Sequence, residues 1–428
     1  MNPVAAERIA ACRQRGESRL SLTHIGLEGF PAAVCELTWL EELEIHGQFT
    51  ALPDEIHQLT RLRTLHLGSS VVDVTSLGGL PELRSLKLNG AKDVPRGLWS
   101  LTRLTDLAII YALFPSPLTG ISGLHDLERL QLHSGAHHHT LRALPDEICD
   151  LGALRRLSLD QSKLRQLPKS LGRLQKLEHL NVYQNRLERL PASFGELGAL
   201  RGLSLRSNRL EKLPSFAELR SLTRVDLAQN RLEALPEGLI DLPDLDRLDV
   251  SYNPLRQLPP RFFSLKHHEY LSLSGHQLTA LPAEIGRLQG VRHLNLSGNP
   301  LGSLPPELGE LTELRTLKAA RCGLTALPSE LGRLTRLTTL DLTGNQLRVL
   351  PDALCRLVEL RHLLLADNRL AALPEGLRSL PLETNTDDEE YDSAYDFVPG
   401  LVVSGNALPL SEAQLRGEPA EILGALVG

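Results

Sequence analysis

Apolar residues return along this chain in a fixed phrase, L-x-x-L-x-L-x-x-N-x-L-x-x-L-P. One copy runs from Leu177 to Pro191 and another from Leu337 to Pro351, and between Leu157 and Leu363 successive copies are spaced by 22 or 23 residues. A fixed period of this size predicts a stack of repeated units, each of which buries its apolar side against its neighbours.

The L-x-L core of each unit predicts a short parallel strand, whose outer two residues point inward while those between and beside them face outward. The predicted strand cores are Leu20–Leu22, Leu43–Ile45, Leu65–Leu67, Leu86–Leu88, Leu107–Ile109, Leu130–Leu132, Leu157–Leu159, Leu180–Val182, Leu203–Leu205, Val225–Leu227, Leu248–Val250, Leu271–Leu273, Leu294–Leu296, Leu317–Ala319, Leu340–Leu342, Leu363–Leu365 and Leu401–Val403.

Between strands, the Leu-Pro steps turn the chain, and the P-x-x-[IL]-G-x-L segments predict short helical or irregular arcs on the convex side. The recurring asparagines are expected to hydrogen-bond backbone groups of their own turn and the next, satisfying polar groups that stacking buries. They are Asn185, Asn208, Asn230, Asn253, Asn299, Asn345 and Asn368, and Cys322 takes the same slot in another copy.

We divide the chain into four parts. Residues 1–17 are predicted to be an N-terminal capping helix with Pro3 in its first turn and Gly16 at its end, and residues 18–382 form about sixteen repeats. Residues 383–397 are an acidic insertion, and residues 398–428 a half-repeat with a second capping helix. The insertion is expected either to be solvated, to fold back near Lys318 and Arg321, or to contact a basic partner.

The repeats resemble leucine-rich repeats of the bacterial and plant-intracellular type. That resemblance implies an α/β solenoid, a leucine-rich repeat horseshoe with a parallel concave β-sheet and helical or irregular convex arcs.

The two ends, Glu7–Gly16 and the segments Gly405–Pro409 and Gly417–Leu423, are similar to the flanks of the repeat domain in bacterial Roco proteins. In that family a Ras-like GTPase domain follows, and the repeats influence its dimerisation and cycling. This sequence ends before any such domain, so we expect a fragment or a free-standing relative.

Composition narrows the class of partner. The formal net charge is -6, which is not the electrostatic signature of a nucleic-acid binder. No apolar run approaches a membrane span, and the N-terminus does not resemble a secretory signal. The five cysteines recur in no disulfide or zinc framework; Cys35, Cys149 and Cys355 take a repeat position held elsewhere by glycine. We therefore expect a cytoplasmic protein with reduced thiols.

The sequence contains no motif for phosphate-loop, zinc-protease or serine-hydrolase chemistry. The candidate metal cluster is His137–His139 with nearby His133, but consecutive loop histidines lack the ordered geometry of a closed site. We therefore expect no enzyme activity, cofactor, metal or small-molecule substrate.

Residues on the concave side of the strands are the candidate binding site. Tyrosine and arginine on an exposed sheet typically anchor protein interfaces. The alternative is a solvated face on which the pairs Arg224/Asp226 and Arg247/Asp249 neutralise each other. The candidate partner-binding residues are Arg129, Arg156, His179, Tyr183, Arg206, Arg224, Arg247, Tyr252 and Tyr270.

The sequence thus predicts a non-catalytic protein-interaction scaffold. Its partner is expected to be another protein or a neighbouring domain of the same chain, without nucleic acid or membrane. Two alternatives stay open: the regulatory repeat domain of a Roco-type GTPase, and a host-targeted bacterial effector of the ubiquitin-ligase or enzyme-inhibitor kind.

Overall fold

The computed structural model describes residues 2–68, 70–112, 118–134, 141–264, 269–383, 400–409, 411 and 418–425. They form two compact units, the first comprising Met1–Val225 with Pro236–Asp244 and the second Asp226–Leu235 with Leu245–Gly428. The predicted histidine cluster His137–His139, and the acidic insertion beyond Glu383, lie outside the described residues.

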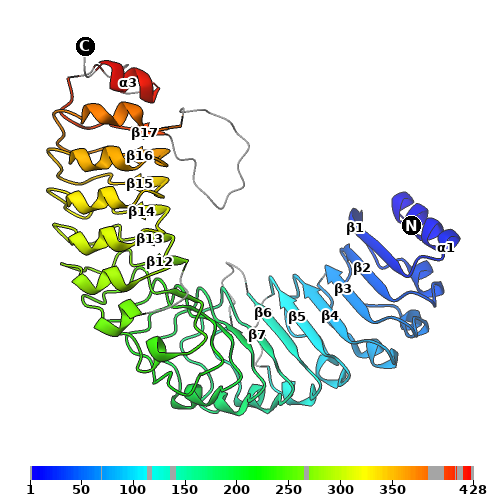
Figure 1. Cartoon of the computed structure of the whole chain (residues 1–428). Coiled ribbons are helices and arrows are strands. Elements are labelled where there is room, and N and C mark those ends of the chain that lie inside the picture. The colour runs from blue at the N-terminus through cyan, green and yellow to red at the C-terminus, as the bar shows by residue number, and fades with distance from the viewer. Residues whose placement is uncertain are drawn as a thin grey trace. The chain divides into compact units, whose positions relative to one another are not determined.

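The first unit contains a parallel sheet with one strand from each repeat (Figure 1). Its strands are β1 (Arg19–Leu27), β2 (Glu42–Gly47), β3 (Thr64–Gly68), β4 (Ser85–Asn89), β5 (Asp106–Ile110), β6 (Arg129–His133), β7 (Arg156–Ser158), β8 (His179–Asn181) and β9 (Gly202–Ser204), followed by β10 (Arg224–Asp226), which spans the sequence boundary between the units. Short 3-10 helices form the opposite side at Ala32–Glu36, Asp54–Gln58, Thr75–Gly79, Leu98–Ser100, Ile121–Gly123, Asp146–Asp150, Leu171–Arg173, Ala192–Glu196 and Leu239–Asp241.

The second unit repeats this arrangement. Its strands are β11 (Arg247–Asp249), β12 (Tyr270–Ser272), β13 (His293–Asn295), β14 (Thr316–Lys318), β15 (Thr339–Asp341), β16 (His362–Leu364) and β17 (Leu401–Val402). Its 3-10 helices are Pro260–Ser264, Ala283–Arg287, Pro306–Glu310, Ser329–Arg333, Asp352–Arg356 and Glu375–Ser379.

The core of each unit lies between the sheet and the 3-10 helices. The two apolar residues that flank the central position of each strand are buried, as Leu157 and Leu159 are in the β7 repeat. The residue between them is half-buried in most strands, whereas Gln131 is exposed and Ser272 is buried. Register keeps equivalent leucines in line, because Leu130 pairs with Leu157 and Leu157 with Leu180. The predicted strand positions and convex arcs are confirmed, and the fold class is the predicted leucine-rich repeat solenoid.

The asparagine slot is filled as predicted. In Asn345, Oδ1 accepts the backbone N–H groups of Cys322 and Leu324, both at 3.0 Å. Its Nδ2 donates to the carbonyl oxygens of Ala319 and Leu342 at 2.8 and 2.7 Å. One buried amide thus satisfies backbone groups of two successive repeats, which is why the slot is occupied so regularly.

The solenoid has a helix at each end of the described chain. Helix α1 (Pro3–Arg15) begins at Asn2, whose side chain accepts from the N–H groups of Val4 and Ala5, and ends at Gly16 with a left-handed φ of 61°. Its residues Ala5, Ile9 and Cys12 are buried. Helix α3 (Pro419–Ala425) buries Ile422 and Leu423, and Arg378 donates to the carbonyl oxygen of Leu423.

The cysteines pack as small apolar residues. All five are free, and only Cys355 is not fully buried. Burial, followed by nearby carboxylates, raises the pKa of the Cys35 and Cys149 thiols to about 11. These thiols therefore stay protonated and unreactive at neutral pH.

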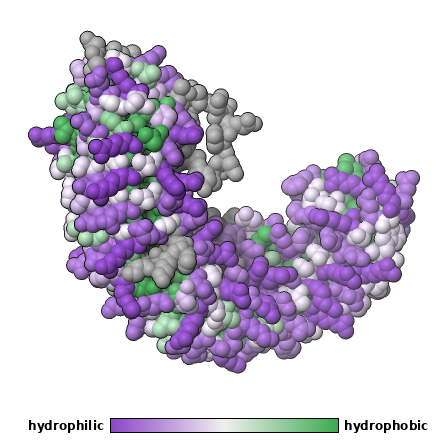
Figure 2. Space-filling model, viewed as in Figure 1, coloured by the Kyte–Doolittle hydropathy of each residue, from purple (hydrophilic) through white to green (hydrophobic). Residues whose placement is uncertain are grey.

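The visible surface is mostly hydrophilic, and apolar residues show only in small separate areas (Figure 2). Among the described residues, every helix is too short or too polar to cross a bilayer.

Candidate functional site

A trough of about 510 Å³ lies on the exposed sheet face of the first unit. We call it the β3–β10 trough, after the strands that line it. Its lining residues are His66, Ser85, Leu86, Lys87, Asp106, Leu107, Ala108, Arg129, Leu130, Gln131, Arg156, Leu157, Ser158, His179, Asn181 and Arg224.

A single column of side chains crosses the floor of this trough. Strand pairing aligns Asp106 with Arg129, Arg129 with Arg156, Arg156 with His179, and His179 with Gly202. Arg224 continues the column, because its backbone N–H donates to Arg201 as Gly202 donates to Glu178 in the preceding repeat. The leucine phrase thus places these side chains one strand spacing apart, about 4.8 Å at the backbone.

The column is predominantly cationic. Arg129 forms an ion pair with Asp106, and this hydrogen bond is the first cause that raises the pKa of the Arg129 guanidinium. Arg156 and Arg224 are exposed and form no ion pair with any residue that the structure describes. Two guanidinium groups are therefore available to an incoming anion.

His179 lies between these two arginines and responds to both. Partial burial, and then the positive charges of Arg156 and Arg224, lower the pKa of its imidazole. Gly202 gives the ring its room, because a Cβ at that position would lie 2.6 Å from His179 Nδ1. His179 is thus mainly neutral at pH 7 and presents a polar ring between two fixed charges.

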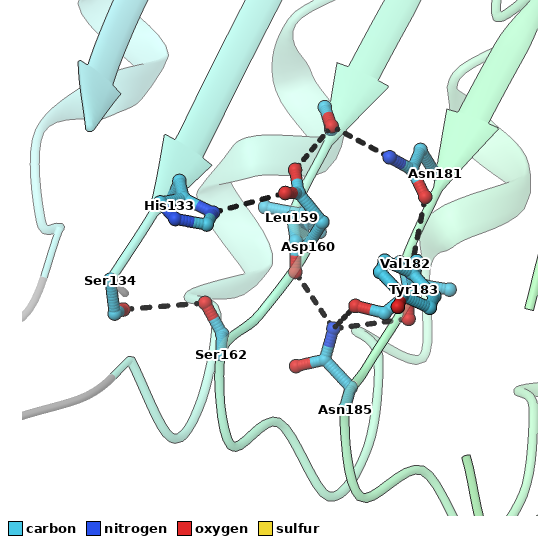
Figure 3. Close-up of polar contacts among 10 residues, drawn as sticks. His133, Ser134, Leu159, Asp160, Ser162, Asn181, Val182, Tyr183 and Asn185 are labelled. Carbon is cyan, nitrogen blue, oxygen red and sulfur yellow. Dashed lines mark hydrogen bonds and ion pairs between the residues drawn. The ribbon is translucent and has the colours of Figure 1, made fainter. Parts of the chain in front are cut away.

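A hydrogen-bond network fixes the next side chains along the same strands (Figure 3). The carboxylate of Asp160 accepts from His133 Nδ1 at 3.0 Å and from Ser158 Oγ at 2.8 Å. Asn181 Nδ2 donates to Ser158 Oγ at 3.2 Å. The ring of exposed Tyr111 stands edge-on to His133, with centroids 5.1 Å apart. Asp160 is therefore held by its own neighbours and its side chain is mostly covered.

The second unit carries aromatic side chains on its sheet face. Tyr252 and Tyr270 are each 56% exposed, an unusual degree for such large rings. The Tyr270 and His293 rings lie 6.4 Å apart in a tilted arrangement. Gly275 makes room for Tyr252, because a Cβ there would lie 2.8 Å from the tyrosine ring.

The structure thus brings together only part of the predicted site. Arg129, Arg156, His179 and Arg224 line the trough. Tyr183 and Arg206 lie one position beyond the β8 and β9 cores and are half-buried, outside the lining. Arg247, Tyr252 and Tyr270 belong to the second unit.

Four polar lining residues near the N-terminal end of the trough were not predicted from the sequence: His66, Ser85, Lys87 and Asp106. The repeat pattern could have identified them, because they occupy the strand positions that Gln131 and Arg129 occupy in a later repeat. Aligning the equivalent strand positions of the N-terminal repeats would have found them.

Neither of the two pairs proposed to neutralise each other, Arg224/Asp226 and Arg247/Asp249, forms a direct ion pair among the described residues. Arg247 lies 4.0 Å from its neighbour Asp246, whereas Asp249 accepts hydrogen bonds from Ser251. Arg224 has no ion pair within the described chain.

This chain is similar to known leucine-rich repeat proteins in both sequence and structure. A family model for the leucine-rich repeat matches residues 145–210, 245–301 and 312–370. No match was found among curated proteins. A leucine-rich repeat protein of Leptospira interrogans is 29% identical with a TM-score of 0.78, and the match covers 87% of this chain and 98% of that one.

More distant structures share the fold. The ectodomain of the plant membrane receptor kinase GASSHO1/SCHENGEN3 from Arabidopsis thaliana, in complex with CASPARIAN STRIP INTEGRITY FACTOR 2, is 26% identical with a TM-score of 0.59. That match covers 91% of this chain and 56% of the receptor chain. YopM from Yersinia enterocolitica is 24% identical with a TM-score of 0.59, and the match covers 95% of this chain and 82% of the YopM chain.

None of these comparisons indicates a catalytic family, and leucine-rich repeats typically serve as protein-interaction scaffolds. The Roco-type resemblance of the ends is not among the similarities found. By its repeats, its parallel sheet and its structural relatives, this chain has the fold of a leucine-rich repeat solenoid.

Proposed function

We propose that this protein is a non-catalytic recognition scaffold that binds a partner protein through the exposed faces of its strands. The observation that carries this proposal is the β3–β10 trough, where Arg156, His179 and Arg224 stand in one column on a rigid parallel sheet. Strand pairing fixes the backbone positions of these residues, so binding needs no rearrangement of the backbone beneath them.

The residue types suit a protein interface. Arginine, with its planar guanidinium and five donors, is enriched at the centres of protein interfaces, and so is tyrosine. The exposed Tyr252 and Tyr270 extend the same chemistry to the second unit. The Arabidopsis receptor ectodomain of similar fold was solved with a bound partner, which supports this use of the fold.

The test is capture and identification with matched variants. The full chain, Arg156→Gln/Arg224→Gln, and Arg61→Gln/Arg220→Gln would be immobilised and exposed to lysate of the source organism. Arg61 and Arg220 are exposed arginines of the first unit that lie in turns and outside the trough, so this control removes the same charge.

A protein retained by the wild type would then be identified, purified and titrated against all three chains. We expect the purified partner to bind the wild type and the turn control equally and the trough variant more weakly. Equal binding of all three would show that the trough is not the recognition surface.

The alternative role as the regulatory repeat domain of a Roco-type GTPase stays a prediction that rests on the sequence of the two ends. A reading frame that continues past Gly428 into a phosphate-binding loop would favour it. The effector alternative also stays a prediction, because the likeness to YopM concerns the fold alone.

We also propose a cytoplasmic location. Its support is the set of five free thiols, most of them buried in the packed solenoid, which fits a reducing compartment. Cell fractionation with an antibody to the protein tests this proposal, and recovery of the protein outside the cytoplasm would contradict it.

A further inference from the structure

The charge and spacing of the trough define its ligand more narrowly than a partner protein in general. We propose that the β3–β10 trough binds an extended acidic segment of the partner, with two carboxylate side chains four residues apart contacting Arg156 and Arg224. This inference rests on the proposed function and names the chemistry that the same surface recognises.

The first support is the charge balance of the lining. Four of its side chains are permanently cationic, Lys87, Arg129, Arg156 and Arg224, whereas Asp106 is its only carboxylate among the described residues. Asp106 is already engaged, because it pairs with Arg129 and accepts from Thr105 Oγ1 at 2.8 Å. The remaining charge of the trough lining is therefore positive, which favours binding of an anion.

The second support is the spacing of the two arginines without ion-pair partners. Arg156 on β7 and Arg224 on β10 are three strand intervals apart, or about 14 Å at the backbone. In an extended segment, side chains at alternate positions share a face, and residues four apart are separated by about 13 Å. A segment that crosses the strands therefore places two such carboxylates over the two guanidinium groups.

The third support is the floor between the arginines. Gly202 has no side chain, and His179 leans into the space above it, where a Cβ would lie 2.6 Å from the imidazole. The imidazole thus takes the place that a side chain at position 202 would fill. The intermediate residue of an extended segment, two positions from each acid, would face this imidazole between the two arginines.

A polypeptide fits this site better than a nucleic acid. The whole chain carries a net charge of -6, so a long polyanion would be repelled outside the trough. The cationic stretch is confined to a few strands of the first unit, so it would contact few phosphates of a nucleic acid, whereas two carboxylates suffice for its two guanidinium groups without ion pairs.

The experiment uses the full chain and synthetic nine-residue peptides of aspartate, serine and glycine. The first peptide carries two aspartates four residues apart, the second carries them three apart, and the third replaces both with asparagine. Binding is followed by NMR signals of arginine Nε–H groups and of His179, because this method detects weak complexes. A short oligothymidylate of equal charge is the nucleic-acid probe.

We expect the first peptide to shift the signals of Arg156, Arg224 and His179, and to bind more tightly than the other probes. In Arg156→Gln/Arg224→Gln its affinity should fall by about tenfold or more, since two charge-assisted contacts are lost. In Arg61→Gln/Arg220→Gln it should remain unchanged. His179 signals in each variant show that the β8 region is still folded.

Three results would overturn the inference: no shift with the first peptide, equal affinity for both aspartate spacings, or equal losses in the two double variants. Preferential binding of the oligothymidylate would replace it with a nucleic-acid site. The proposed scaffold function fails separately, because it depends on whether a purified protein partner loses affinity in the trough variant. A partner that loses affinity there while the acidic peptide does not bind would leave the scaffold proposal standing alone.

Discussion

The imidazole of His276 lies 2.9 Å from the backbone carbonyl oxygen of Asn253, through Nδ1. His276 stands in the ladder slot that asparagine fills in neighbouring repeats, and Nδ1 must carry the hydrogen because the carbonyl accepts. The second ring nitrogen, Nε2, is buried without a hydrogen-bond partner among the described residues. The histidine thus performs only part of the work of an asparagine amide.

This substitution predicts acid sensitivity of the second unit. Burial lowers the pKa of His276 from 6.5 to about 4. The unfolded chain takes up the proton first, so folding stability is full above pH 6.5 and falls as the pH drops toward 4. The cost approaches about 3 kcal/mol once both states are protonated. We expect His276→Asn to lose less stability than wild type in urea titrations between pH 7 and 4; parallel losses would contradict this assignment.

The asparagine ladder predicts a stability cost for Asn345→Ala. Its amide satisfies four buried backbone groups at 2.7–3.0 Å, and alanine leaves them without partners. The free energy of unfolding should fall by about 1–3 kcal/mol. Asn89→Ala is the control, because Asn89 lies at the end of β4 and its side chain makes no hydrogen bond with the described residues. Equal midpoints of denaturation for the two variants would refute the role of the ladder.

The pKa of His179 should report the charges around it. Burial is the largest cause of the lowered pKa, and the positive charges of Arg156, Arg224 and, least, Arg201 lower it further, while Glu178 raises it. Replacing Arg156 and Arg224 with glutamine should move the pKa upward toward 6.5, as measured by NMR titration of the imidazole. A bound acidic peptide should raise it as well, so the affinity for that peptide should increase as the pH falls and His179 takes up a proton. An unchanged pKa in the double variant would place the arginines too far away to matter.

Asp106→Asn should strengthen binding of acidic probes. The substitution releases Arg129 from its ion pair and removes the only carboxylate in the described trough lining. We expect about a two- to fivefold gain in affinity at low salt, which shrinks at high salt because the site is open to solvent. Glu55→Gln, on the convex side, removes the same charge as a control. A loss of affinity in Asp106→Asn would mean that Asp106 positions Arg129 for binding.

The fold was largely predictable because its information is local and repeated. Each inward leucine, such as Leu157 or Leu340, has an equivalent in the next repeat, so one strand assignment sets the register of its neighbours. The hydrogen bonds of the recurring asparagines were predictable for the same reason, since Asn345 can satisfy the backbone of the preceding repeat only from its fixed position in the repeat.

The site was less predictable because ion pairing depends on which way long side chains lean. The repeat pattern placed Arg129, Arg156 and Arg224 on one face of the sheet. It did not show that Arg129 alone would pair with Asp106 from the preceding strand. Nor did spacing show that Arg247 would turn toward Asp246 instead of Asp249. The room that Gly202 gives to His179 depends on ring orientation, which no repeat pattern encodes.

Arginine footprinting would show whether the exposed strand face binds a partner protein. Phenylglyoxal modification would be compared by mass spectrometry for the free chain and for its purified complex. We expect Arg156 and Arg224 to be protected in the complex while Arg61 and Arg220 react as before. Protection of Arg61 and Arg220 with unchanged reaction at Arg156 and Arg224 would contradict it.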